Sequence, residues 1–269
     1  MNSRYEVTPR DKKISSLAQP QRLKGRVAIV TGGSAGLGRS ACLALAREGA
    51  FVVIVGRDRK RLAEVVGRVE SECGSPALGL RLDVTREADM EEMAVKTLER
   101  FGCIDILIAS AGILRAPNLG MKTLMQTPVT AWETLINTNL KGTFLSMRAV
   151  LPQMIRQRSG DILTLSSKSG VRGLAFDSAY CASKFGVIGL TESVAQEVQS
   201  QGVRVQTLLP GTFDTELWAQ NNVMSRPKDL PPPVRVAELM IWMITLPRDA
   251  CVAAPLIEPI RTVSMPSWS

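Results

Sequence analysis

The stretch RVAIVTGGSAGLG, residues 26–38, decides how the chain begins to fold. The apolar run 26–32 predicts a buried strand, and the glycines after it predict a tight turn. Residues 36–49 predict a helix that ends at Gly49. Glycines in such a turn let the backbone approach a pyrophosphate, and the helix start offers N–H groups to it. The stretch therefore predicts a dinucleotide site, with an ordinary tight turn as the alternative.

The same alternation of strand and helix continues along the chain. Apolar runs predict further strands at 51–56, 77–83, 104–110, 161–167, 203–211 and 251–260, and amphipathic stretches predict helices at 58–73, 86–101, 130–157, 177–200 and 234–246. Strands that alternate with helices form a parallel sheet with right-handed crossovers. The predicted fold class is therefore α/β: a single Rossmann-type doubly wound domain of about seven parallel strands, flanked by helices on both faces. Ligands bind such sheets beyond the carboxyl ends of the strands.

Charge is concentrated at the N-terminus of the 269-residue chain. Residues 1–26 contain seven basic and two acidic residues, which account for +5 of the net charge of +8. We expect residues 1–22 to be a poorly ordered basic tail and residues 23–269 to be the catalytic domain. The tail has neither interleaved aromatic residues nor a long apolar run, so a nucleic-acid or membrane partner is disfavoured.

The absence of histidine excludes several kinds of chemistry. The chain contains no histidine, so a Ser-His-Asp triad and histidine metal ligands are excluded. Residues 32–36 match the G-x-S-x-G pattern of hydrolases, but the base that this reaction needs is missing. The five cysteines are scattered and odd in number, which favours reduced thiols, no metal site and a cytoplasmic location.

The end of the second strand predicts which nicotinamide cofactor is bound. Enzymes that use NAD(H) usually place an acid there to bind the ribose, but this chain has Gly56 followed by Arg57. A guanidinium can bind a 2′-phosphate in bidentate fashion, whereas a carboxylate would repel it. We therefore expect NADP(H) rather than NAD(H), with an ordinary surface arginine as the alternative. Asp58 is expected to cap the next helix.

A tyrosine and a lysine lie four residues apart in the sequence YCASK, at positions 180 and 184. On a helix these side chains share a face. Reduction of a carbonyl needs a proton donor for the developing alkoxide, and a nearby ammonium lowers the pKa of a phenol. Ser167 ends the fifth strand and could donate a hydrogen bond to the substrate oxygen. This set predicts hydride transfer with Tyr180 as the acid/base.

The chain resembles the short-chain dehydrogenase/reductase family over residues 22–258. The resemblance rests on TGGSAGLG (31–38), LDVT (82–85), SAG (110–112), INTNLKG (136–142), LTLSS (163–167), YCASK (180–184) and LLPG (208–211). It implies four catalytic residues: Asn139, Ser167, Tyr180 and Lys184. Asn139 would shape the site and support a proton relay, and Lys184 would also hold the nicotinamide ribose. The expected cofactor contacts are Gly32, Ser34, Gly36, Leu37, Gly38, Arg57, Asp83, Val84, Ala111, Gly112, Asn139, Tyr180, Lys184, Pro210, Gly211, Phe213 and Thr215.

The sequence also departs from the family pattern. Ala109-Ser110-Ala111-Gly112 stands where Asn-Asn-Ala-Gly is common, and the stretch between Gly112 and Asn139 is a few residues longer than usual. Lys168 is either a contact for an acidic substrate group or solvent-facing, and Ser169 is expected to line the substrate pocket. That pocket would be built from loops 113–129, 168–176 and 212–233.

The leading functional hypothesis is an NADP(H)-dependent carbonyl reductase or alcohol dehydrogenase that acts on a small molecule. The alternatives are a 3-oxoacyl-[acyl-carrier-protein] reductase, a non-catalytic NADP-binding regulatory protein and, from the basic charge, a nucleic-acid-binding protein. The resemblance further implies a homodimer or homotetramer formed through helices near 86–101 and 130–200 and through the last strand.

Overall fold

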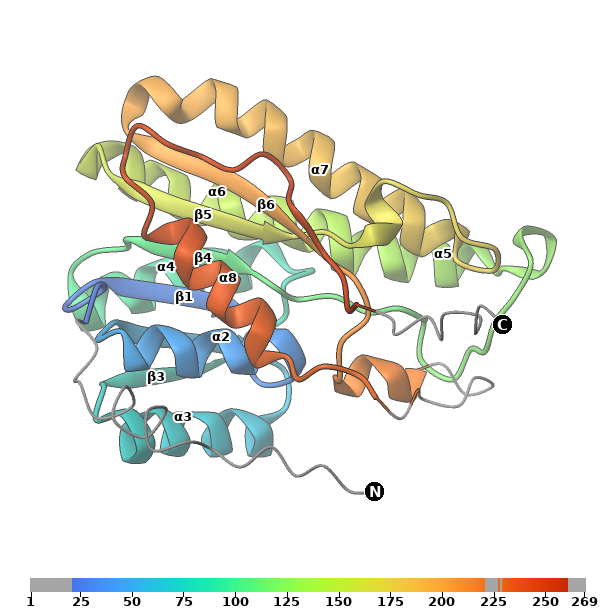
Figure 1. The fold of residues 1–269 in the computed structure, drawn as a ribbon, viewed down its shortest axis with the longest axis horizontal. Coiled ribbons are helices and arrows are strands. Elements are labelled where there is room, and N and C mark those ends of the chain that lie inside the picture. Colours follow the sequence, from blue (N-terminus) through green and yellow to red (C-terminus); the bar gives the residue numbers. More distant parts are fainter. Residues whose placement is uncertain (1–20, 221–226, 228, 261–269) are drawn as a thin grey trace, which may run out of the picture.

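One parallel sheet organises the protein. The structure, a computed structural model, describes residues 21–220, 227 and 229–260. Within these residues seven parallel strands follow the order β3-β2-β1-β4-β5-β6-β7, which confirms the predicted α/β class (Figure 1). The strands are β1 (Val27–Thr31), β2 (Phe51–Gly56), β3 (Ala77–Arg81), β4 (Ile106–Ala109), β5 (Gly160–Leu165), β6 (Val203–Pro210) and β7 (Leu256–Ile257).

Helices cover both faces of the sheet because the side chains of each buried strand alternate between the faces. In β1, Ala28 and Val30 point into one apolar cluster, and Val27 and Ile29 point into the other. The first cluster is closed by α2 (Gly36–Arg47), α3 (Arg59–Cys73) and α8 (Val234–Ile244). The second is closed by α4 (Glu87–Phe101), α6 (Gly142–Gln157) and α7 (Ser178–Val198). Figure 1 shows α8 and α2 side by side on the first face.

The strand order reverses at β1, and this reversal positions the candidate site. β1 pairs with β2 on one side and with β4 on the other. The chain therefore adds β2 and β3 on one side of β1 and then crosses over to add β4 on the other side. A doubly wound sheet opens a crevice at such a point, at the carboxyl ends of its strands. The glycine-rich turn after β1 and Ser167 after β5 both lie at this edge.

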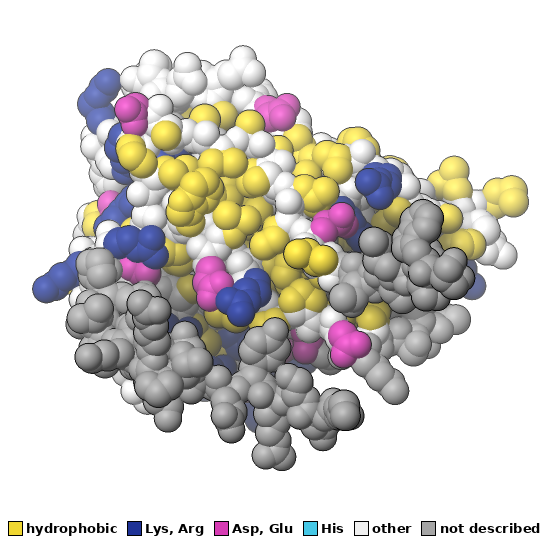
Figure 2. Space-filling view, in the orientation of Figure 1, with side chains coloured by type: hydrophobic (Ala, Val, Ile, Leu, Met, Phe, Trp, Pro, Cys, Tyr) yellow, Lys and Arg dark blue, Asp and Glu magenta, His cyan; other side chains and the backbone are white. Residues whose placement is uncertain are grey.

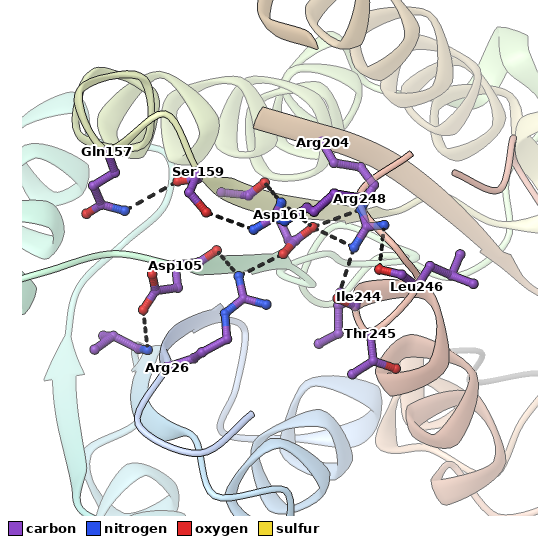
Figure 3. A network of polar contacts seen from close by, with 12 residues as sticks. Arg26, Asp105, Gln157, Ser159, Asp161, Arg204, Ile244, Thr245, Leu246 and Arg248 are labelled. Atoms are coloured by element: carbon purple, nitrogen blue, oxygen red, sulfur yellow. Dashed lines mark hydrogen bonds and ion pairs between the residues drawn. The ribbon is translucent and has the colours of Figure 1, made fainter. Parts of the chain in front are cut away.

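The opposite edge of the sheet is held together by a buried carboxylate. Asp161 near the start of β5 is 1% exposed and forms ion pairs with Arg26 at 2.7 Å, Arg204 at 2.8 Å and Arg248 at 3.3 Å (Figure 3). Arg204 also donates hydrogen bonds to backbone carbonyls at and after the end of α8, including that of Ile244 at 3.0 Å. These contacts fix β1, β5, β6 and α8 to one another, away from the candidate site.

Two predicted elements differ from those in the structure. The predicted helix 130–157 is divided into α5 (Val129–Leu135), a π-helical turn (Ile136–Lys141) and α6. The predicted strand 251–260 is reduced to the two residues of β7. Pro255 just before β7 has no backbone N–H to donate to a neighbouring strand, and Ala254 has a positive φ of 45°, so the extended run cannot begin earlier.

The predicted tail boundary is corrected at Arg22. Residues 1–20 of that tail lie outside the described residues, but Arg22 is anchored to Glu48 by an ion pair of 2.5 Å. Leu23 is buried in the core, and its N–H donates to the carbonyl of Glu48 at 2.9 Å. The fold therefore begins before residue 23. Within the described part of the chain, no helix has the length and apolar character that a bilayer crossing requires.

Candidate active site

The turn after β1 is a cradle that only glycine can form. Gly32 and Gly36 have φ values of +67° and +51°, in the left-handed region that favours glycine. A Cβ on Gly32 would lie 2.7 Å from the Cα of Ala111, and a Cβ on Gly38 would overlap the carbonyl of Gly32. The turn thus presents bare backbone at the carboxyl edge of the sheet. This shape fits the pyrophosphate of a dinucleotide, which needs a close approach of the backbone.

A carboxylate is seated at the start of α2. The Gly36 N–H donates to Glu216 Oε2 at 2.9 Å, and Arg39 Nη2 lies 2.7 Å from Glu216 Oε1. Burial alone would raise the pKa of Glu216, but backbone N–H groups and Arg39 hold it below its usual value. A negative charge at this position is favoured by the partial positive charge of the helix start. Anions therefore suit this turn, as expected for a phosphate-binding site.

The remaining predicted contacts of this turn divide between backbone and side chain. Thr215 lies beside Gly36: a Cβ added to this glycine would be 3.4 Å from the Cβ of Thr215. Leu37 and Phe213 point their side chains into the apolar core under α2 and α8. Phe213 is buried, so a contact with a cofactor would come from its backbone, whereas Leu37 is only half-buried.

The end of β2 brings together the residues predicted to choose the cofactor. A Cβ on Gly56 would lie 2.7 Å from Ser34 Oγ, so this position has no room for an acidic side chain unless Ser34 moves. Arg57 is 66% exposed, and its Nη1 lies 3.7 Å from Asp83 Oδ2. Asp58 accepts from the N–H groups of Lys60 and Arg61 at 2.9 and 3.0 Å, which confirms its predicted role as the cap of α3.

The ends of β3 and β4 bring further predicted contacts to the same edge of the sheet. Asp83 follows β3, and its Oδ1 accepts from the N–H and hydroxyl of Thr85, both at 2.9 Å. Val84 is buried against Gly142. Gly112 follows β4, where a Cβ would lie 3.3 Å from Asn139 Oδ1 and 3.6 Å from Lys184 Nζ. The end of β4 therefore meets two of the predicted catalytic residues.

Asn139 lies on the π-helical turn between α5 and α6 and is fully buried. Its Oδ1 accepts from the Ile113 N–H at 2.8 Å, and its Nδ2 donates to the Ile113 carbonyl at 2.9 Å and to Ser183 Oγ at 3.0 Å. π-Helical turns are rare and occur mostly at functional sites. The side-chain amide thus fastens the segment after β4 to α7, whereas its role in a proton relay stays a prediction.

The predicted serine lies beside the tyrosine. Ser167 follows β5, is buried, and hydrogen-bonds with the Tyr180 hydroxyl. Its Oγ also accepts from the Ser169 N–H at 3.1 Å, which turns the chain into the next segment. Ser169 is buried, and its role as a pocket residue stays a prediction. Lys168 is neither free nor fully exposed, because its Nζ lies 3.6 Å from Glu258.

Tyr180 and Lys184 share one face of α7, and both are buried. The Lys184 Nζ lies 5.7 Å from the centre of the Tyr180 ring and donates to the Leu165 carbonyl at 2.8 Å. A lysine buried among apolar groups is stabilised in its neutral form, and burial lowers the pKa of Lys184 to about 8. It therefore still carries a positive charge at neutral pH.

Burial and nearby polar groups act on the pKa of Tyr180. Burial raises the pKa of Tyr180 to about 12, and the hydrogen bond with Ser167 opposes this rise. Two charges outside the predicted set also act on the phenol: Asp177 raises its pKa and Arg115 lowers it. Lys184 directs its ammonium at the Leu165 carbonyl, so lowering of the tyrosine pKa by Lys184 stays a prediction.

The end of β6 supplies the last predicted contacts. Pro210 is the final residue of this strand, and the Gly211 N–H donates to the Ile257 carbonyl at 2.8 Å. A Cβ on Gly211 would lie 2.8 Å from Glu258 Cγ, so the short strand β7 packs tightly against this turn. β7 thereby fixes the far side of the crevice.

Sequence reasoning missed four polar residues around the site. Arg115 pairs with Asp177 directly before α7, Glu216 binds the glycine turn, and Gln220 Oε1 accepts from the Leu114 N–H at 2.8 Å. Arg115 lies in loop 113–129, and Glu216 and Gln220 lie in loop 212–233, so the expected pocket loops are the only signal that pointed to them. Their partners are distant in sequence, so no local pattern indicates the contacts.

Comparison with known proteins gives a consistent result. The family model described as "short chain dehydrogenase" matches residues 26–225. An "uncharacterized oxidoreductase" of Staphylococcus saprophyticus is 36% identical over 88% of this chain and 99% of its own length. A 3-oxoacyl-[acyl-carrier-protein] reductase of Staphylococcus epidermidis is 39% identical over 71% of this chain and 76% of its own length.

Solved structures agree with this result. An alcohol dehydrogenase from the archaeon Thermococcus sibiricus, complexed with 5-hydroxy-NADP, has a TM-score of 0.77 at 28% identity and covers 86% of this chain and 95% of its own. Levodione reductase has a TM-score of 0.80 at 27% identity, covering 88% of this chain and 96% of its own. Both the sequence matches and the fold place the protein among oxidoreductases that use nicotinamide cofactors, and the chain belongs to the short-chain dehydrogenase/reductase family.

Proposed function

We propose that the protein is an NADP(H)-dependent oxidoreductase that interconverts a carbonyl compound and the corresponding alcohol, with Tyr180 as the general acid/base. The observation that carries this proposal is the meeting of Tyr180, Ser167, Lys184 and Asn139 at the edge of the sheet that also holds the glycine cradle. Substrate and cofactor would meet there beyond the carboxyl ends of the strands.

The chain's own groups account for proton transfer. Bound NADPH would supply the hydride to the carbonyl carbon. The Ser167 hydroxyl donates a hydrogen bond to the carbonyl oxygen, and the Tyr180 hydroxyl gives its proton to that oxygen as negative charge develops. In the reverse direction the phenolate takes the proton back. A phenol with a pKa of about 12 is protonated at neutral pH, which favours its use as the acid in reduction.

The proposed preference for NADP(H) rests on the end of β2. Position 56 is glycine, so it supplies no acid to bind an unphosphorylated ribose, and the guanidinium of Arg57 is exposed beside it. A 2′-phosphate can bind to this arginine without meeting a carboxylate at position 56. Asp83 is paired with Arg57 across 3.7 Å and would help to orient the guanidinium.

The test uses NADPH oxidation with a panel of small ketones, aldehydes and keto esters. Tyr180→Phe should lose at least about 100-fold in kcat, because a general acid contributes about that much or more. Tyr5→Phe is the matched control, since it makes the same chemical change at the only other tyrosine. A Tyr180→Phe enzyme with the turnover of the parent would refute the assignment.

A second candidate is reduction of a 3-oxoacyl group on an acyl carrier protein, because reductases of this name are 39–40% identical to the chain over 71% of its length. Turnover of an acetoacetyl thioester that exceeds turnover of free ketones would favour this candidate. The non-catalytic alternative predicts NADPH binding with no oxidation by any carbonyl. The complete set of four polar side chains supports the catalytic proposal.

Charge on the described surface gives little support to the nucleic-acid alternative. Figure 2 shows basic side chains separated by acidic and apolar ones on the visible part of this face. Many arginines are paired with carboxylates, including Arg39, Arg68 and Arg148. Nucleic-acid binding requires clustered, available cations.

We infer that the protein assembles through α6 and α7. These helices border a groove of about 480 Å³ that is lined mainly by apolar side chains, and Phe144 and Phe185 are more than two-fifths exposed. Exposed apolar area of this kind is typical of contacts between subunits. Light scattering of Phe144→Glu should show a smaller assembly than the parent; an unchanged mass would contradict this interface.

A further inference from the structure

A buried ion pair lies outside the predicted catalytic set. The Arg115 Nη2 is 2.5 Å from Asp177 Oδ1, and their side chains are only 9% and 15% exposed. Among the described residues Arg115 Nε has no hydrogen-bond partner, and Asp177 Oδ1 has none besides this ion pair. Burying two charges is costly unless their polar atoms are well satisfied. The desolvation of this pair therefore reduces the stability of the fold, so stability alone does not explain its presence.

The pair also replaces an ordinary helix cap. Asp177 is the residue before α7, a position where aspartate normally accepts hydrogen bonds from the first N–H groups of the helix. Asp58 makes such bonds at the start of α3, whereas the side chain of Asp177 makes none in α7. Its carboxylate is directed at Arg115 instead. Attraction to Arg115 thus takes precedence over capping the helix that carries Tyr180.

The geometry brings both charges close to the Tyr180 phenol. Asp177 and Tyr180 are one helical turn apart, and with Arg115 they line a cavity of about 30 Å³, room for about one water. The tyrosine packs against Ala131 and Leu135, in an apolar cluster. The phenol and both charged side chains are largely buried, so solvent screens their interaction less than it would at the surface.

The other titratable groups near the phenol are few. They come from three segments: Lys122 from the loop after β4, Lys168, which pairs with Glu258, from the turn after β5, and Cys181 and Lys184 from α7 itself. Lys184 donates to a backbone carbonyl. Cys181 raises the tyrosine pKa less than Asp177 does, although its effect is larger than the lowering by Arg115. Arg115 and Asp177 are therefore the opposed pair of charges beside the phenol.

We propose that Arg115 and Asp177 are positioning residues whose opposed charges adjust how readily the Tyr180 hydroxyl gives up its proton. Arg115 stabilises the phenolate, and Asp177 destabilises it. Removing one partner leaves the other uncompensated, so the two single substitutions should act in opposite directions. A catalytic role for the phenol rests on the proposed function, but the effect of the two charges on the phenol does not.

The composition of the chain allows a direct test. Its only tyrosines are Tyr5 and Tyr180, so in a Tyr5→Phe background the near-ultraviolet absorbance of phenolate reports Tyr180 alone. A stopped-flow jump to alkaline pH records this absorbance before the protein unfolds. No cofactor or substrate is needed. The variants are Arg115→Met, Asp177→Asn, the double substitution, and Arg115→Lys as the conservative control.

Opposite shifts are expected. Asp177→Asn should lower the tyrosine pKa by about 1, and Arg115→Met should raise it by a smaller amount. The double variant should lie between the two single variants, and Arg115→Lys should lie near the parent. If Arg115→Met fails to fold, the double variant replaces it, because it leaves no buried charge without a partner. Its tyrosine pKa should be higher than that of Asp177→Asn. Single substitutions that leave the pKa unchanged, or move it in the same direction, would show that the pair has only a structural role.

The holoenzyme provides a second readout. In the oxidation direction kcat/KM depends on the fraction of phenolate, so at any alkaline pH that the enzyme tolerates it should be higher in Asp177→Asn and lower in Arg115→Met than in the parent. If no carbonyl or alcohol is turned over, the proposed function fails while the tyrosine titration remains interpretable. If turnover occurs but both profiles overlay that of the parent, the charge pair is refuted and the proposed function survives.

Discussion

Replacing Glu216 by glutamine should tighten the binding of NADP(H). The Glu216 carboxylate accepts the Gly36 N–H at 2.9 Å and pairs with Arg39 at 2.7 Å, so it lies where the phosphate-binding turn is expected to receive the cofactor. Two phosphate charges entering this turn would meet a third negative charge. Either the carboxylate moves or the repulsion remains, and both weaken binding.

The magnitude follows from the two contacts. A hydrogen bond to a charged acceptor is worth about 1.5–3 kcal/mol, and an exposed ion pair at most about 1 kcal/mol. Because the Glu216 side chain is 43% exposed, solvent screens both contacts. Glutamine keeps a neutral acceptor for the N–H, so we expect a gain of about 1 kcal/mol, or about a fivefold lower Kd.

Fluorescence titration with NADPH and NADH measures this effect, and both should tighten because they share the pyrophosphate. Glu99→Gln is the matched control, since it removes the same charge from the distant end of α4. Weaker binding by Glu216→Gln than by the parent would refute the reasoning, and it would assign Glu216 a supporting role in the bound state.

Three further predictions concern the cofactor, the fold and pH. Arg57→Glu should raise the KM for NADPH at least about tenfold while changing that for NADH little, since a charge-assisted contact is worth about 1.5–3 kcal/mol; equal changes in both would contradict the proposed 2′-phosphate contact. Asp161→Asn should reduce the free energy of unfolding in urea by about 3 kcal/mol, because three arginines would lose their buried counter-ion; a loss below about 1 kcal/mol would show that the cluster relaxes freely. NADPH affinity should fall as pH rises through about 8, where Lys184 loses its charge, because the pKa of this lysine is lowered and the ammonium exists only below it. Lys184→Arg should bind with a flat profile over this range, and an unchanged fall in that variant would exclude the lysine as the titrating group.

The sheet could be predicted from the sequence because its strands are short runs of apolar residues. β1 and β2 are buried on both faces, so nearly every residue in them must be apolar, and this leaves a strong local pattern. The glycine cradle was equally visible, since only glycine fits its backbone. The length of β7 was overestimated because the apolar run already begins at residue 251, whereas Ala254 and Pro255 prevent regular pairing before Leu256.

The π-helical turn at Asn139 was not predictable from periodicity. The apolar residues of 130–157 follow one helical period. The π-helical turn shifts this period by only one residue, so the pattern still indicates one continuous helix. The turn is stabilised by the amide contacts of Asn139 with Ile113 and Ser183, which are distant in sequence. Sequence identified the residue but not the local structure that directs its side chain.

The chemistry of the catalytic residues was predicted in part. The shared face of Tyr180 and Lys184 follows from helical spacing, and the structure has it. The environment of the phenol does not follow, because Arg115 and Asp177 become neighbours only when the loop after β4 folds against the start of α7. Burial raises the pKa of Tyr180 and the hydrogen bond with Ser167 opposes this rise, and neither effect can be deduced from spacing along one helix.

The central claim is that Tyr180 protonates the oxygen of a carbonyl whose carbon receives hydride from a bound nicotinamide. Transfer of deuterium from 4-deuterated NADPH to the product tests it most directly, measured by mass spectrometry for the parent and for Tyr180→Phe. The parent should place deuterium on the carbinol carbon, and the variant should do so at least about 100-fold more slowly although it still binds NADPH. Products without deuterium, or equal rates in the two proteins, would contradict the claim.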